Sequence, residues 1–193
     1  MFDMLIHEND TDYGILTGSN LLLYIKVGNG GEIYGPENRY LAIALESRTT
    51  YGCSVLVASN PTDLSVREAM ARDGAFIDKQ FPDTEIIYAI GHSKGGQMLA
   101  SYAYTNPKIK RVLSVNAPLM INLHRTKEGI LRFCGRRMTM VYGEKDQSVR
   151  YAPMLGSLAS ASFGYEIVKN ADHGFEGMNE EFCSLPRHYL FEI

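Results

Sequence analysis

The stretch Glu85-Ile86-Ile87-Tyr88-Ala89-Ile90-Gly91-His92-Ser93-Lys94-Gly95-Gly96 decides the fold. Residues 85–90 are mostly β-branched or apolar, which is typical of a strand buried on both faces. The next five residues fit G-x-S-x-G, and an amphipathic helix is predicted directly after them. A strand that turns at once into a helix strains the central residue and exposes its side chain at the strand's carboxyl end. We therefore expect Ser93 at a helix N-terminus, where free N–H groups favour negative charge.

The two flanking glycines support this interpretation. At Gly91 and Gly95 the strand and the helix must pass close to Ser93, and a Cβ there would collide with backbone. The pattern alone also arises by chance, and the alternative is then a serine without a catalytic role in a tight turn. The strand before it and the helix after it favour the functional interpretation.

The segment Gly91-His92-Ser93-Lys94-Gly95-Gly96 resembles the nucleophile elbow of the α/β-hydrolase superfamily. The resemblance implies an α/β fold with a mostly parallel central sheet and helices on both faces. It also implies a serine nucleophile, and a small, lidless, esterase-like member of the superfamily.

The rest of the chain alternates predicted strands and helices, which favours a mostly parallel sheet covered on both faces. An N-terminal antiparallel hairpin is expected from 2–7 and 13–17. Further strands are expected at 21–27, 54–58, 111–116, 138–142 and 165–169. Helices are expected at 37–48, at 64–80 with Asp63 as N-cap, from the elbow to about 104, at 126–134, at 148–160 and at the C-terminus.

Composition limits the function classes. With 193 residues, 45% of them hydrophobic, we expect a single α/β-hydrolase domain spanning 1–193. The net charge of −3 gives no support for nucleic-acid binding, which would need a basic face. No apolar run is long enough to span a membrane, and the N-terminus carries acids where a signal peptide needs basic residues. The three cysteines, Cys53, Cys134 and Cys183, are read as buried thiols in a reducing compartment, so we expect a cytoplasmic protein.

A serine hydroxyl needs a base to take its proton and a carboxylate to orient that base. His173 follows the last predicted strand, and Asp146 follows the strand before it. The order Ser93, Asp146, His173 matches that of the superfamily, whose Gly-x-x-Asp and His-Gly segments resemble 143–146 and 173–174. Glu144 and Asp172 are the competing acids. The alternatives are that Asp146 is only a turn residue or the N-cap of the helix at 148–160, and that His173 faces solvent.

Two backbone N–H groups should stabilise an oxyanion. One is expected from Lys94, whose side chain should lie in solvent or over the site entrance. The other is expected from the turn after 21–27. The segment Val27-Gly28-Asn29-Gly30-Gly31 resembles the superfamily's His-Gly-Asn-Ala-Gly loop, which makes Asn29 the second donor. Val27 stands where the histidine usually is, which puts the conformation of the loop in question. The alternative, a phosphate-binding glycine loop, lacks both G-x-x-x-x-G-K-[ST] and G-x-G-x-x-G.

Only residues 117–137 separate two of the predicted strands, so no cap domain is expected and the site should be open. Substrate contacts are expected from Gly28, His92, Pro118 and Leu119, and Met120, Ile121 and Leu123 should add to the lining. His92 occupies an interior position of the elbow, where packing is commoner than reaction. No metal-ligand spacing occurs, so neither metal nor cofactor is expected.

These features together predict a serine hydrolase that cleaves a small ester, thioester or related acyl bond. The expected partner is a small-molecule acyl substrate. Two alternatives remain open: an acyltransferase that uses the same triad, and a non-catalytic binding protein of this fold.

Overall fold

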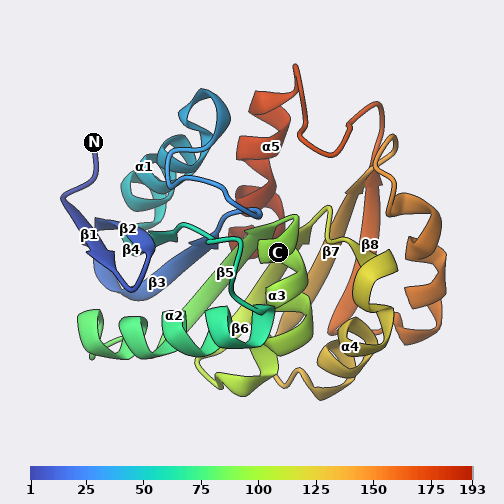
Figure 1. The fold of residues 1–193 in the computed structure, drawn as a ribbon, viewed down its shortest axis with the longest axis horizontal. Coiled ribbons are helices and arrows are strands. Elements are labelled where there is room, and N and C mark those ends of the chain that lie inside the picture. The colour runs from blue at the N-terminus through green and yellow to red at the C-terminus, as the bar shows by residue number, and fades with distance from the viewer. Residues whose placement is uncertain (193) are drawn as a thin grey trace.

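In the computed structural model, which describes residues 1–192, the strands form one sheet in the order β1-β2-β4-β3-β5-β6-β7-β8 (Figure 1). Strands β1 and β2 form the expected antiparallel hairpin, and β2 also runs antiparallel to β4. From β4 to β8 all neighbours are parallel. The strands are β1 (Met4–Glu8), β2 (Thr11–Leu16), β3 (Ser19–Lys26), β4 (Cys53–Ala58), β5 (Ile86–His92), β6 (Ile109–Val115), β7 (Arg137–Gly143) and β8 (Phe163–Val168).

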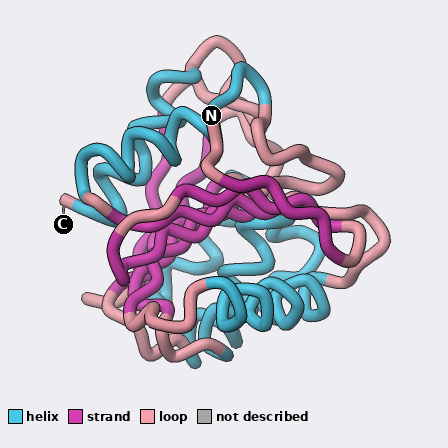
Figure 2. Tube along the Cα trace, turned by 90° about the vertical axis from the view of Figure 1, so that its left-hand side faces the viewer, coloured by secondary structure: helices cyan, strands magenta, loops and turns pink. Residues whose placement is uncertain are grey.

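Helices cover both faces of this sheet (Figure 2). Helices α1 (Arg39–Tyr51) and α5 (Asn179–Pro186) pack together over one face. Helices α2 (Val66–Gln80), α3 (Lys94–Tyr102) and α4 (Leu119–Arg132) form a layer on the other. Short helical segments are η1 (Pro36–Asn38), η2 (Ala103–Thr105), η3 (Val149–Leu158) and η4 (Arg187–Phe191).

The strand sequences explain this layering. Successive side chains of a strand point to opposite faces. Leu22 and Tyr24 of β3 belong to the core beneath α2, α3 and α4, whereas Leu23 and Ile25 belong to the core beneath α1 and α5. Because both faces are buried, the strand is an apolar run without polar alternation. The expected fold class is confirmed.

Three local expectations need correction. Helix α2 begins after Ser65, not Asp63, because Ser65 and Glu68 form a reciprocal capping box. Segment η3 is a 3₁₀ helix containing Pro153, which lacks the N–H that a regular α-helix needs there. Cys134 is exposed, so the expectation of three buried thiols is wrong for that residue.

The sheet's carboxyl edge carries no cap domain within residues 1–192. Between β6 and β7 the chain contains only α4, which starts earlier than expected and is kinked at Asn122. No helix in the described part of the chain has the length and apolar character needed to cross a membrane.

A buried ion pair lies beneath the end of β3. The Lys26 Nζ atom is 2.6 Å from the Asp73 carboxylate of α2, and both side chains are almost fully buried. Lys26 also donates to the Ser59 carbonyl oxygen at 2.7 Å. The Tyr13 and Tyr24 hydroxyls donate to Asp73 as well, so each charge has several partners. Burial lowers the pKa of Lys26, and the Asp73 carboxylate opposes that shift.

We expect Asp73→Asn to lower the free energy of unfolding by about 3–5 kcal/mol, because it leaves a buried ammonium without its counter-charge. Urea unfolding followed by circular dichroism measures this loss. The matched control is Asp78→Asn, which breaks the largely exposed pair with Lys108 at 3.0 Å and should cost less than about 1 kcal/mol. Equal losses in the two variants would contradict the expectation.

Candidate active site

The turn between β5 and α3 has the geometry expected of an elbow. Ser93 has φ 52° and ψ −121°, a strained conformation for a residue other than glycine. A Cβ on Gly91 would lie 2.4 Å from the Gly95 carbonyl group, and one on Gly95 would lie 2.3 Å from the Lys26 carbonyl oxygen. The expectation that both positions require glycine is confirmed.

The structure brings together the three side chains predicted to form the triad. The Ser93 hydroxyl lies 3.0 Å from His173 Nε2. On the other side of the ring, His173 Nδ1 donates to Asp146 Oδ2. Asp146 is buried, and its Oδ1 accepts the Ser148 N–H at 2.6 Å, whereas the His173 side chain is half exposed. A fixed carboxylate therefore orients an imidazole that faces both the serine and the solvent.

The two competing acids have other partners. Glu144 Oε2 accepts the Asn170 N–H at 2.9 Å. Asp172 Oδ1 accepts the Glu176 N–H, also at 2.9 Å. Glu144 thus bonds across to the loop after β8 and Asp172 bonds within that loop, so Asp146 is the acid that holds His173.

Electrostatics favour a basic imidazole at this position. The hydrogen bond to Asp146 raises the pKa of His173 above its ordinary value of 6.5, although partial burial opposes the shift. The negative charges of Asp146 and Asp172 raise it further. A raised pKa strengthens the base but requires a higher pH before the ring is neutral.

His92 is not available for the substrate contact expected of it. Its Nε2 donates to the His173 carbonyl oxygen at 2.8 Å, and its Nδ1 lies 3.3 Å from the Tyr40 hydroxyl. Burial lowers the pKa of His92 to about 4, so the ring is neutral at pH 7. Both ring nitrogens are therefore used in connecting α1 to the His173 loop. Arg39 adds a second connection, from its guanidinium to the Gly174 carbonyl oxygen at 2.6 Å.

Asn116, which the sequence analysis did not single out, anchors the same loop. It is fully buried just after β6, with φ 48°. Its Nδ2 donates to the carbonyl oxygens of Asp172 at 3.0 Å and His173 at 2.9 Å. Its Oδ1 accepts the Gly143 N–H at 2.8 Å. One side chain thus ties the end of β7 to the loop that carries His173. Its position directly after a strand, at the carboxyl edge, was the available signal.

The loop predicted to supply an oxyanion donor lies against Ser93. A Cβ on Gly28 would be 3.4 Å from the Ser93 Cβ, so the backbone passes close to the serine. Asn60 ties this loop to the neighbouring one: Gly30 N–H donates to its carbonyl oxygen at 2.8 Å, and its Nδ2 donates to the Val27 carbonyl oxygen at 3.1 Å. Within residues 1–192 the main-chain N–H groups of Asn29 and Lys94 donate to no other protein group.

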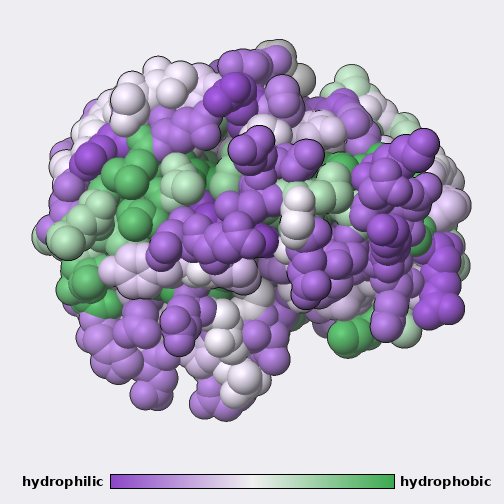
Figure 3. Space-filling view, turned by 90° about the horizontal axis from the view of Figure 1, so that it is seen from above, coloured by the Kyte–Doolittle hydropathy of each residue, from purple (hydrophilic) through white to green (hydrophobic). Residues whose placement is uncertain are grey.

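A hollow of 510 Å³ opens beside His173 and is lined by Pro118, Met120, Lys145, Asp146, Gln147, Ser148, Asp172, His173, Gly174 and Glu176. Pro118 is among these residues, as expected, but Leu119 is not. Leu119 is fully buried in the core beneath α4, so the expectation that it contacts substrate is wrong. Met120 lines the hollow as expected, whereas Ile121 and Leu123 do not. The face seen in Figure 3 is mostly polar, with apolar side chains in separate areas.

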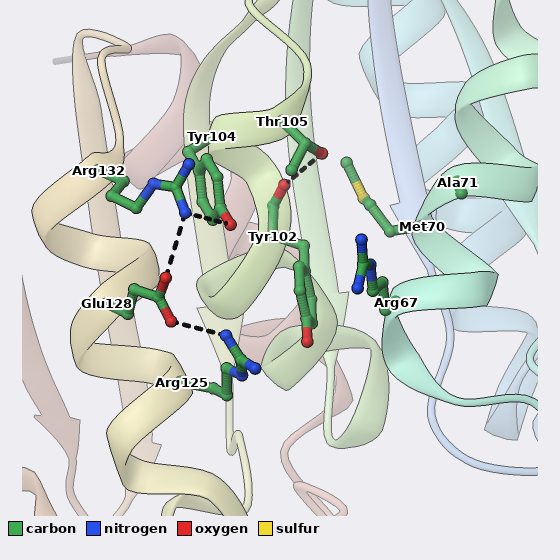
Figure 4. Close-up of a pocket in the computed structure, with 9 residues that line it drawn as sticks. All are labelled: Arg67, Met70, Ala71, Tyr102, Tyr104, Thr105, Arg125, Glu128 and Arg132. Carbon is green, nitrogen blue, oxygen red and sulfur yellow. Dashed lines mark hydrogen bonds and ion pairs between the residues drawn. The ribbon is translucent and has the colours of Figure 1, made fainter.

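A second hollow, of 330 Å³, lies away from the triad between α2, η2 and α4 (Figure 4). Its Glu128 pairs with both Arg125 at 2.8 Å and Arg132 at 3.1 Å, and Arg132 lies over the Tyr104 ring. None of the triad residues lines it. In the described residues no cluster of His, Cys, Asp and Glu side chains could hold a metal ion.

Comparisons with solved structures identify the architecture. No protein-family model matches the sequence, and no curated protein matches it. The chain is similar to Est1E from Butyrivibrio proteoclasticus, with TM-score 0.78, 15% identity and coverage of 98% of this chain and 97% of that one. It is also similar to an alpha-beta serine hydrolase homologue from Coxiella burnetii, with TM-score 0.70, 16% identity and 98% coverage of both chains. A thioesterase domain from the curacin biosynthetic pathway gives TM-score 0.68 at 13% identity, covering 94% of this chain and 97% of that one. At such identities the likeness concerns the fold.

We expect activity to rise with pH through the pKa of His173, since the ring must be neutral to accept a proton. The midpoint in the wild type should lie above 6.5, because Asp146 raises that pKa. Asp146→Asn removes the main cause, so the midpoint should move to lower pH while the maximal rate falls about 10³–10⁴-fold. Profiles of kcat/KM against pH with a p-nitrophenyl ester measure both effects. Glu144→Gln is the matched control and should leave the midpoint unchanged; a wild-type midpoint below 6.5 would refute the assignment.

We expect Asn116→Ala to lower the free energy of unfolding by about 1–3 kcal/mol, because the buried Gly143 N–H loses its acceptor. The rate should also fall, since the carbonyl groups of Asp172 and His173 each lose one of their hydrogen-bond donors. Urea unfolding and ester hydrolysis measure the two effects. Asn106→Ala removes a partly buried turn contact remote from His173 and serves as control; an Asn116→Ala variant as stable and active as that control would contradict the anchoring role.

Proposed function

We propose that this chain, which has the α/β-hydrolase fold, is a serine hydrolase that cleaves a small ester, thioester or related acyl bond. The observation that carries the proposal is the unbroken hydrogen-bonded line from Ser93 through His173 to Asp146. Each member comes from a different loop at the carboxyl edge of the sheet, and each has the partner that its role requires.

The proposed reaction has two halves. In the first, Ser93 Oγ attacks the acyl carbon while its proton passes to His173 Nε2. The resulting tetrahedral oxyanion accepts hydrogen bonds from the main-chain N–H groups of Asn29 and Lys94. Collapse expels the alkoxide or thiolate, which takes the proton from His173. In the second half a water molecule attacks the acyl-enzyme and gives up a proton to His173. The bond between Ser93 Oγ and the acyl carbon then breaks, His173 returns the proton to Oγ, and the acid is released.

The shape of the site supports a small acyl substrate. The hollow beside His173 is bounded by Pro118 and Met120 on one side and by polar residues elsewhere. With only α4 between β6 and β7, nothing in residues 1–192 covers a long apolar chain. A long-chain lipase would need a broader apolar enclosure. Short acyl groups are therefore the proposed substrates.

We expect a fluorophosphonate probe to label the wild-type protein and to leave Ser93→Ala unlabelled, because the probe reacts with an activated serine. Gel fluorescence measures labelling, and Ser160→Ala, at an exposed serine remote from the triad, is the matched control that should label normally. Among p-nitrophenyl esters the shortest acyl chains should be hydrolysed fastest. Persistent labelling or turnover in Ser93→Ala would refute the proposed function.

A further inference from the structure

The sequence analysis placed the Lys94 side chain either in solvent or over the site entrance, but in the structure its ammonium group is fixed by hydrogen bonds. Its Nζ donates to Asn29 Oδ1 at 3.0 Å and to the carbonyl oxygens of Pro61 and Thr62, both at 3.3 Å. An ammonium group has three donors and no acceptor. These three oxygens therefore use its full hydrogen-bonding capacity.

The contacts of Lys94 join three separate segments. Lys94 is the first residue of α3, directly after the nucleophile. Asn29 lies in the loop after β3, and Pro61 and Thr62 lie in the loop after β4. The Lys94 side chain therefore connects the elbow to both neighbouring loops.

The other hydrogen bonds that connect the Asn29 loop to its neighbour involve residues on either side of Asn29. The Val27 carbonyl oxygen and the Gly30 N–H both bond to Asn60. Within residues 1–192 the contact from Lys94 Nζ is the only hydrogen bond made by the Asn29 side chain. The backbone on either side of Asn29 is held by Asn60 and by the packing of Gly28 against Ser93, so the Lys94 bond is the one that acts on the Asn29 side chain itself.

Asn29 and Lys94 are also the residues whose main-chain N–H groups would bind the oxyanion in the proposed reaction. The hydrogen bond between the Lys94 and Asn29 side chains therefore links the two residues that carry these main-chain N–H groups. Oxyanion donors act by being held in place before charge develops. A loop free to shift by about 1 Å would lose up to about 10²-fold in rate.

We propose that Lys94 is a positioning residue, whose ammonium holds Asn29 so that the oxyanion site is formed before substrate binds. The inference rests on the proposed function. It gives the Lys94 side chain a role separate from that of the Lys94 main-chain N–H. A substitution of the side chain leaves that N–H in place, so the two roles can be tested separately.

The test is a double-mutant cycle with p-nitrophenyl acetate. Lys94→Met keeps the apolar stem and removes the three donors, and Asn29→Ala removes the acceptor while keeping the main-chain N–H. Each should lower kcat about 10–100-fold with KM within twofold, because the lost contact matters for the transition state. The double variant should be no slower than the worse single variant, since both remove the same bond. Lys94→Arg, which retains donors and charge, should recover part of the loss.

The matched control is Lys79→Met, which removes an ammonium paired with Glu8 at the surface at 2.7 Å and should leave kcat and KM unchanged. Three results would overturn the proposal: rate losses that multiply in the double variant, a Lys94→Met effect confined to KM, or a normal kcat in Asn29→Ala.

Circular dichroism verifies folding, and if Lys94→Met does not fold, Asn29→Ala decides alone because it leaves α3 intact. Ser93→Ala separates the two levels: activity in that variant refutes the proposed hydrolase, whereas an inactive Ser93→Ala with a fully active Asn29→Ala refutes only the role of Lys94.

Discussion

The close backbone contact between Gly91 and Gly95, and between Gly95 and the end of β3, is the constraint on which the site depends. Because no Cβ intervenes, α3 starts immediately after β5 and crosses beside β3. This places Ser93 in a conformation that few side chains tolerate, and the packing of the sheet and α3 sustains the strain. The same approach brings the β3 loop against the serine, so the nucleophile and the expected oxyanion donors are placed by one steric fact.

The opposite side of the site is built by hydrogen bonds. The loop that carries His173 follows β8 and reaches the end of β5, and its carbonyl groups are held by Asn116, His92 and Arg39. Two of these donors are neutral, and the third, Arg39, is largely buried. The loop thus presents the imidazole to Ser93 through fixed main-chain anchors, while the Asp146 carboxylate sets the orientation of the ring.

The sequence was informative wherever function follows from local order along the chain. Ser93, Asp146 and His173 each follow an apolar strand directly or within a few residues, so their common edge could be predicted from parallel topology alone. Contacts between distant segments could not. Asn116 and Tyr40 resemble ordinary loop and helix residues until their partners, more than 20 positions away, are known.

Leu119 shows the converse: an apolar residue next to a strand end was read as lining the site, but α4 begins there and turns that side chain into the core. The Lys94 side chain likewise has acceptors on two other loops, which no pattern in its own neighbourhood reveals.

The uncovered carboxyl edge bears on the fate of a covalent intermediate. Enzymes that hand an acyl group to a chosen acceptor must keep bulk solvent from competing for it, and commonly do so by closing a lid over the reacting centre. Here the imidazole is half exposed, and α4 is the only helix between β6 and β7 in the described chain. In the proposed reaction an ester formed on Ser93 would therefore be open to the surrounding water, an arrangement that fits water as the second reactant.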